Sequence, residues 1–131
     1  MFVGAFPFDL EDPGVTIAFA ICNAGVDPAD VESSIDSEIN RVKTELISDE
    51  EYEKLRNQIE NDFVSSNSRV AGIAESLANY HMYYGNASLI NTELDRYLAV
   101  TKKDIMAAAQ KFFTKDNRVV LYYMPKPVEQ P

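Results

Sequence analysis

FVGAFPFDLEDPGVTIAFAIC, residues Phe2–Cys22, sets the β part of the architecture, because it predicts two strands joined by a turn. The first segment, Phe2–Phe8, is rich in aromatic residues, which favour strands. Asp9–Gly14 combines acidic residues with a Pro-Gly pair, and this composition is typical of a turn. In Val15–Cys22 bulky and small residues alternate, so the second strand has one bulky face and one closely packing face. The bulky residues are Val15, Ile17, Phe19 and Ile21.

After this stretch the apolar residues recur every three or four positions, which indicates amphipathic helices. Asp27-Pro28 predicts a helix start, because it pairs a capping oxygen with proline at the first helical position. Ser48–Glu51 and Thr101–Asp104 predict capping boxes, the second with Asp in place of the usual Glu. We expect about five helical segments, with a break at Ser65–Ser68 and a helix end at Gly85.

The last structured segment, Arg118–Met124, reads as a strand that stops at Pro125. The order ββ-ααααα-β predicts an α+β fold, with helices packed on one face of a small antiparallel sheet of about three strands. Residues 1–126 are expected to form a single domain around a packed core, since 46% of the chain is hydrophobic, and residues 127–131 a disordered tail. Three strands are a thin sheet for this much helix, so the domain is expected to be truncated.

Charge excludes some classes of partner. The formal net charge is −9, which argues against nucleic-acid and anionic-membrane binding. Residues 1–62 carry 15 acidic and 4 basic residues, whereas residues 63–131 carry 6 acidic and 8 basic ones, so the acid lies in the first half. The sequence shows neither a signal-peptide pattern nor an apolar segment long enough to span a bilayer. These observations do not decide in which compartment the parent protein lies.

The sequence offers little for catalysis, and we assign no catalytic, cofactor-binding or metal residue. Zinc needs three or four ligands, almost always including His or Cys, and His81 and Cys22 are the only residues of these types. We interpret His81 as a partly buried structural imidazole and Cys22 as an inert buried thiol. A carboxylate cation site at Asp9–Asp12 or Ser48–Glu51 and a Cys22–His81 hydrolase dyad are the alternatives left open.

Three segments carry a family resemblance: Glu51–Phe63 (EYEKLRNQIENDF), Arg69–Asn86 (RVAGIAESLANYHMYYGN) and Leu94–Lys126. The most specific part of the last is AVTKKDIMAAAQKFFTKDNRVVLYYMPK, a capped helix followed by a strand and Pro-Lys. Together they resemble the second half of a domain of the pitrilysin/insulinase zinc metallopeptidase family, specifically the C-terminal, non-catalytic domain. These motifs are structural, so they point to family membership more than to chemistry.

The resemblance implies an α/β-roll half-domain in a parent peptidase whose paired domains enclose a peptide chamber. The family's H-x-x-E-H motif is missing from the sequence, so zinc is expected in the parent's catalytic domain and this chain by itself is expected to be inactive. Arg69 and Tyr80 lack the spacing of the family's arginine–tyrosine pair, so no functional residue is carried over. Met1 is then expected to be an internal residue of a longer protein or an artificial start.

The expected partners are the parent's remaining domains and, indirectly, a peptide substrate. The alternative function is a free-standing interaction module that binds a partner through an exposed strand edge or helical face. Under either function we expect the bare edge near Phe2–Phe8 and Val15–Cys22 to be covered, for example in a homo-oligomer.

Overall fold

The computed structural model describes residues 1–8, 10 and 14–125 of the 131-residue chain. It confirms the α+β class. Two strands, β1 (Phe2–Phe8) and β2 (Val15–Ile21), form an antiparallel sheet. The predicted turn at Asp9–Gly14 lies mainly outside the described residues, and the predicted tail at 127–131 lies wholly outside them.

The helices begin where the capping residues predict. Helix α1 (Pro28–Thr44) starts after Asp27, whose carboxylate accepts a hydrogen bond from the Ala29 amide at 2.9 Å. Helix α2 (Asp49–Ser66) starts with the capping box of Ser48 and Glu51, and α5 (Lys102–Phe112) with that of Thr101 and Asp104. Local side-chain chemistry therefore fixes these three starts.

The intervening helices differ in detail from the prediction. The break expected at Ser65–Ser68 lies slightly later, at residues 67–69, because α2 extends through Ser66. Helix α3 (Val70–Tyr84) follows it and ends at Gly85, whose φ of 68° is the left-handed conformation expected of a C′ glycine. Between α3 and α5 the chain forms a 3-10 helix, η1 (Ala87–Asn91), followed by the short helix α4 (Glu93–Leu98). A further 3-10 turn, η2, spans Lys115–Asn117.

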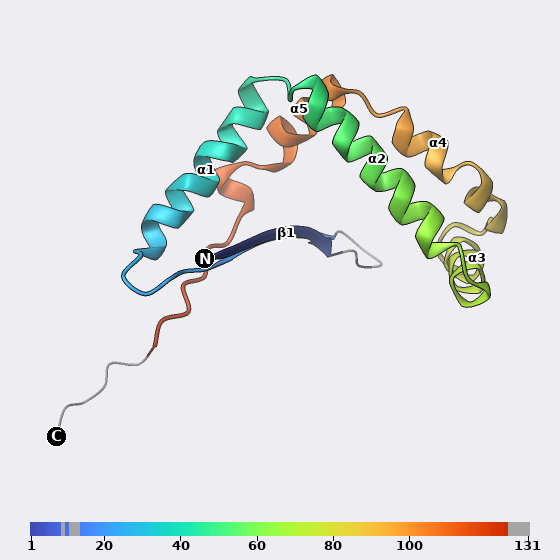
Figure 1. Ribbon diagram of the computed structural model, residues 1–131, viewed down its shortest axis with the longest axis horizontal. Helices are drawn as coiled ribbons and strands as arrows, with labels where there is room; N and C mark the ends of the chain where they lie inside the picture. Colours follow the sequence, from blue (N-terminus) through green and yellow to red (C-terminus); the bar gives the residue numbers. More distant parts are fainter. Residues whose placement is uncertain (9, 11–13, 126–131) are drawn as a thin grey trace.

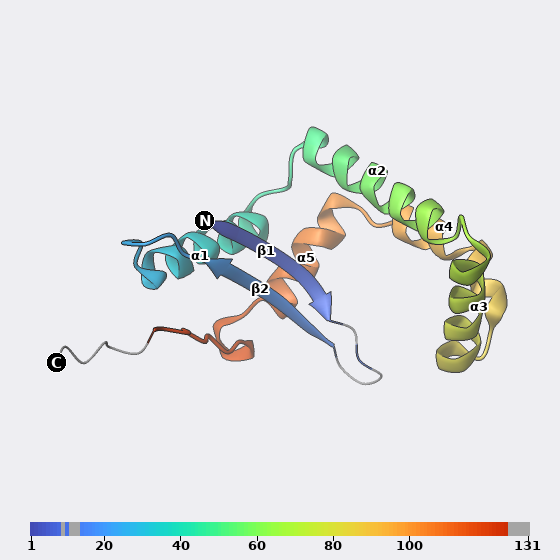
Figure 2. The same cartoon turned by 60° about the horizontal axis from the view of Figure 1, so that its bottom comes forward.

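The molecule is an arch (Figure 1). One limb contains the hairpin, α1 and α5, and the other contains α2, α4 and α3. Helix α1 packs on α5, α2 packs on α4, and α3 packs on η1. Figure 2 shows the hairpin lying across the limb formed by α1 and α5.

Two expectations were wrong. Arg118–Met124 is not a strand, because no neighbouring backbone in the described part of the chain pairs with it. The expected packed core is also missing, since only Ile47 and Ala109 are buried among the described residues. The open arch brings too few elements together to enclose more side chains. None of the helices in the described ranges combines the length and apolar character needed to cross a bilayer.

Candidate interaction surface

The two faces of the hairpin differ sharply in chemistry. The register aligns the bulky residues of both strands on one face, in the pairs Phe2–Ile21, Gly4–Phe19, Phe6–Ile17 and Phe8–Val15. We call this the outer sheet face; its large residues are Phe2, Phe6, Phe8, Val15, Ile17, Phe19 and Ile21. All seven are exposed, from 36% for Ile17 to 63% for Ile21. Because exposed apolar patches are typical of interaction sites, we take this face as the candidate surface.

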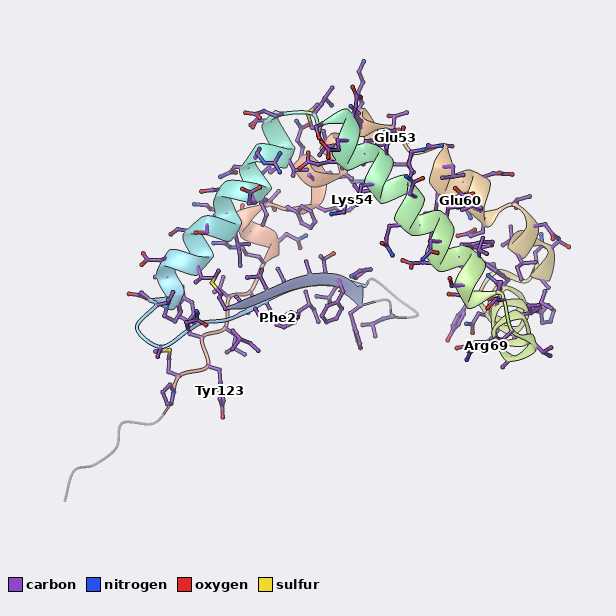
Figure 3. All side chains as sticks on the ribbon, viewed as in Figure 1. Phe2, Glu53, Lys54, Glu60, Arg69 and Tyr123 are labelled. Atoms are coloured by element: carbon purple, nitrogen blue, oxygen red, sulfur yellow. The ribbon has the colours of Figure 1, made fainter. Side chains whose placement is uncertain are left out.

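The opposite face of the hairpin carries small residues and faces the helices. Thr16, which points away from the outer sheet face, lines a groove of about 380 Å³ together with Val42 of α1 and several residues of α5. Figure 3 shows Phe2 on the side of the hairpin away from the helical layer. The small face therefore lies toward the helices without being buried, since Ala5, Thr16 and Ala18 are exposed, and the bulky face is uncovered as well.

Gly4 organises the aromatic residues of the outer sheet face. A Cβ at Gly4 would lie 2.8 Å from Cε1 of Phe19, so the glycine leaves the space that the Phe19 ring fills. The Phe19 ring contacts Phe2 at a centroid distance of 5.6 Å and Phe6 at 6.1 Å. These distances fall within the favourable range for aromatic pairs, so the face presents an ordered aromatic cluster.

A second uncovered segment is residues 118–125, which we call the C-terminal strap. Its Arg118 guanidinium binds two carboxylates one turn apart on α1: Glu32, at 2.8 Å, and Asp36. The Tyr122 hydroxyl donates a hydrogen bond to Glu32 as well. Hydrogen bonding to Asp36 raises the pKa of Arg118, and hydrogen bonding to Glu32 raises the pKa of Tyr122. These contacts clasp the strap to α1.

The apex of the arch is joined by polar contacts. The Tyr52 hydroxyl of α2 donates to the Val100 carbonyl at 2.8 Å, just before α5. The Arg56 guanidinium and the Lys102 ammonium lie 5.5 and 5.8 Å from the Tyr52 ring centre. Ile47, one of the two buried residues, lies in the linker between α1 and α2. These contacts connect the two limbs at the apex.

The residues considered for catalysis are far apart. Cys22 follows β2, whose end lies beside α1, whereas His81 belongs to α3 at the opposite end of the molecule (Figure 2). The dyad alternative is therefore wrong. His81 is exposed, not partly buried as expected, and Cys22 is half-buried.

The structure gives no support to the two carboxylate cation sites considered at Asp9–Asp12 and Ser48–Glu51. The Glu51 carboxylate accepts hydrogen bonds from the Ser48 amide and hydroxyl, both at 3.1 Å, so it serves as a helix cap. The Asp9–Asp12 segment lies mainly outside the described residues. Within the described ranges, no cluster of three His, Cys, Asp or Glu residues could hold a metal ion.

Sequence reasoning pointed to an exposed edge of the hairpin but not to the outer sheet face, although the signal for that face was visible. The alternation in Val15–Cys22 shows that one strand face is bulky, but it does not reveal whether helices cover that face. The contacts of Arg118 with α1 join residues more than 80 positions apart, and no local pattern announces them.

Comparisons of this chain with models of protein families, with curated proteins and with solved structures returned no match.

Proposed function

We propose that this chain is a non-catalytic structural segment of a zinc metalloendopeptidase, which helps to form the wall of the parent's peptide-enclosing chamber. The observation that carries the structural part of the proposal is the uncovered outer sheet face. Seven large apolar side chains on one side of a two-stranded sheet require a second layer, because a sheet is stable only when its apolar face is packed. The remaining domains of the parent would supply that layer.

The accessible surface supports the same proposal. The chain exposes 10893 Å², whereas a compact monomer of 14.7 kDa exposes about 6,900 Å². The excess is roughly 4,000 Å², several times the area of about 800 Å² that one partner buries in a standard interface. A segment that completes its core on another polypeptide accounts for this excess.

The peptidase identity of the parent rests on the resemblance of Glu51–Phe63, Arg69–Asn86 and Leu94–Lys126 to that family. The contribution of the chain is architectural, since a lone imidazole cannot build the family's zinc site. Zinc and the catalytic residues would belong to the parent's other domain.

The coding sequence around this chain provides the test. The proposal expects an H-x-x-E-H motif in the same polypeptide or in an adjacent gene. Co-expression of that catalytic part with this chain should give peptide cleavage that a zinc chelator abolishes, whereas either part separately should give none. Absence of the motif, or chelator-sensitive cleavage by this chain by itself, would contradict the proposal.

A free-standing interaction module is the second candidate, and the open sheet edges favour it. Each strand of a two-stranded sheet has one unpaired edge, and an extended peptide can add to such an edge. A chain translated independently, with no peptidase part encoded nearby, would favour this function over the first.

A further inference from the structure

The two limbs of the arch are joined at its apex. The chain passes between them twice, through residues 45–48, which connect α1 to α2, and through residues 99–101, which connect α4 to α5. Within the described ranges, each extensive contact between helices lies inside one limb: α1 packs on α5, α2 on α4, and η1 on α3 and α4. From the apex the two limbs diverge (Figure 1). Each limb is therefore a packed unit that can move about the two linkers.

Both linkers have the backbone geometry of a hinge. Glu45 and Ser48 are extended, with ψ values of 143° and 162°, and Thr101 is extended as well, with ψ 164°. Among the described residues, Leu46 and Ile47 make no backbone–backbone hydrogen bond. Hinges are typically a few residues between elements or at their ends, which absorb φ and ψ changes. Rotation at these linkers would leave the hydrogen bonds of the flanking helices intact.

Two cations of the limb that contains α1 and α5 reach across the apex to the first turn of α2. Lys102 of α5 forms an ion pair with Asp49, and its ammonium lies 5.8 Å from the Tyr52 ring centre. The Arg41 guanidinium of α1 lies 3.5 Å from the Glu51 carboxylate. We call these contacts the apex lock. The acidic partners are exposed, Asp49 by 97% and Glu51 by 48%, and exposed ion pairs are weak and screened by salt. The apex lock can therefore open and form again.

We propose that the apex of the arch is a hinge, which the ion pairs of Arg41 and Lys102 with α2 hold in the observed position. When the apex lock opens, rotation about residues 45–48 and 99–101 changes the separation of the limbs without unfolding either one. The hydrogen bond from the Tyr52 hydroxyl to the Val100 carbonyl, 2.8 Å long, ties the start of α2 to the second linker, so the pivot stays together. This inference concerns the chain by itself and does not depend on the peptidase proposal.

The first test measures the distance between the limbs in the full chain by pulsed electron paramagnetic resonance. Spin labels are attached at Ser37→Cys on α1 and Glu75→Cys on α3, both exposed positions, in a Cys22→Ser background. Labelled chain is diluted with unlabelled chain, so that only distances within one molecule contribute. We expect one main distance at about 20 mM NaCl and a second population, at a changed separation, at about 1 M NaCl. A distribution that is the same at both salt concentrations would overturn the proposal.

The second test removes one cation of the apex lock. Lys102→Met should raise the second population about threefold at low salt, and Lys102→Arg, which keeps the charge, should restore the natural distribution. Lys103→Met is the matched control, since it removes an equal charge from the same helical turn at an exposed position, and it should have no effect. A natural distribution in Lys102→Met, or the same change in both methionine variants, would contradict the proposal. Circular dichroism checks that each variant is folded, and the salt series on the natural Lys102 decides the question if Lys102→Met is not.

Discussion

Gly72 lies near the start of α3, against the carbonyl group that ends α2. A Cβ at this position would lie 1.9 Å from the Ser66 carbonyl oxygen. The clash is with backbone, so it cannot be relieved by moving a flexible side chain. We predict that Gly72→Ala lowers the free energy of unfolding by roughly 1–3 kcal/mol, measured by urea denaturation followed by circular dichroism.

The matched control for Gly72→Ala is Ala74→Ser, an exposed position two residues later on α3. It should change the free energy of unfolding by less than about 0.5 kcal/mol. Equal stability of Gly72→Ala and the natural chain would mean that α2 and α3 do not meet as described.

Single residues were predicted from sequence only where their chemistry is local. Gly85 was identified as a helix end because a left-handed C′ residue favours glycine. The sequence did not reveal the role of Gly72, because that role depends on contact with a carbonyl group at the end of the preceding helix. His81 was expected to be partly buried because it borders the apolar stripe of its helix. Its exposure depends on what packs against α3, which the local sequence does not reveal.

At the scale of the helix, the capping box of α2 gives a pH-dependent prediction. The hydrogen bond from the Ser48 amide, followed by that from the Ser48 hydroxyl, lowers the pKa of Glu51 below its usual value of 4.5. Because the folded-state pKa is depressed, the contribution of this carboxylate to stability is present above pH 4.5 and is lost as pH falls through the folded-state pKa. Glu51→Gln should therefore lower the urea midpoint at pH 7, and the difference from the natural chain should shrink below pH 4.5.

Glu50→Gln is the control for Glu51→Gln, since it removes the same charge from the same helical turn outside the capping box. Its effect on the urea midpoint should be smaller at pH 7. A Glu51→Gln effect that is independent of pH would show that the ionised carboxylate does not stabilise the helix start.

The helices were easier to predict than the sheet for a physical reason. A helix start such as Asp27-Pro28 is specified within a few residues. A strand is specified only when another strand supplies hydrogen bonds, and Arg118–Met124 has β-forming residues but no backbone partner in the described chain.

At the scale of the whole molecule, composition predicted a packed core that the arch does not form. The apolar residues are present, but many lie on the outer sheet face and the C-terminal strap, where no other part of the described chain covers them. Hydrophobic content indicates how much surface can be buried, but not whether the burying partner belongs to the same chain. The structural part of the function that we propose rests on this difference.

The most direct test of this account is the unfolding of the isolated chain as a function of its concentration, followed by circular dichroism. If the core is completed between polypeptides, unfolding should be broad at roughly 1 µM, and its midpoint should rise as the concentration approaches roughly 100 µM. A sharp transition of a monomer, with a midpoint independent of concentration, would show that the chain completes its own core and would contradict the account.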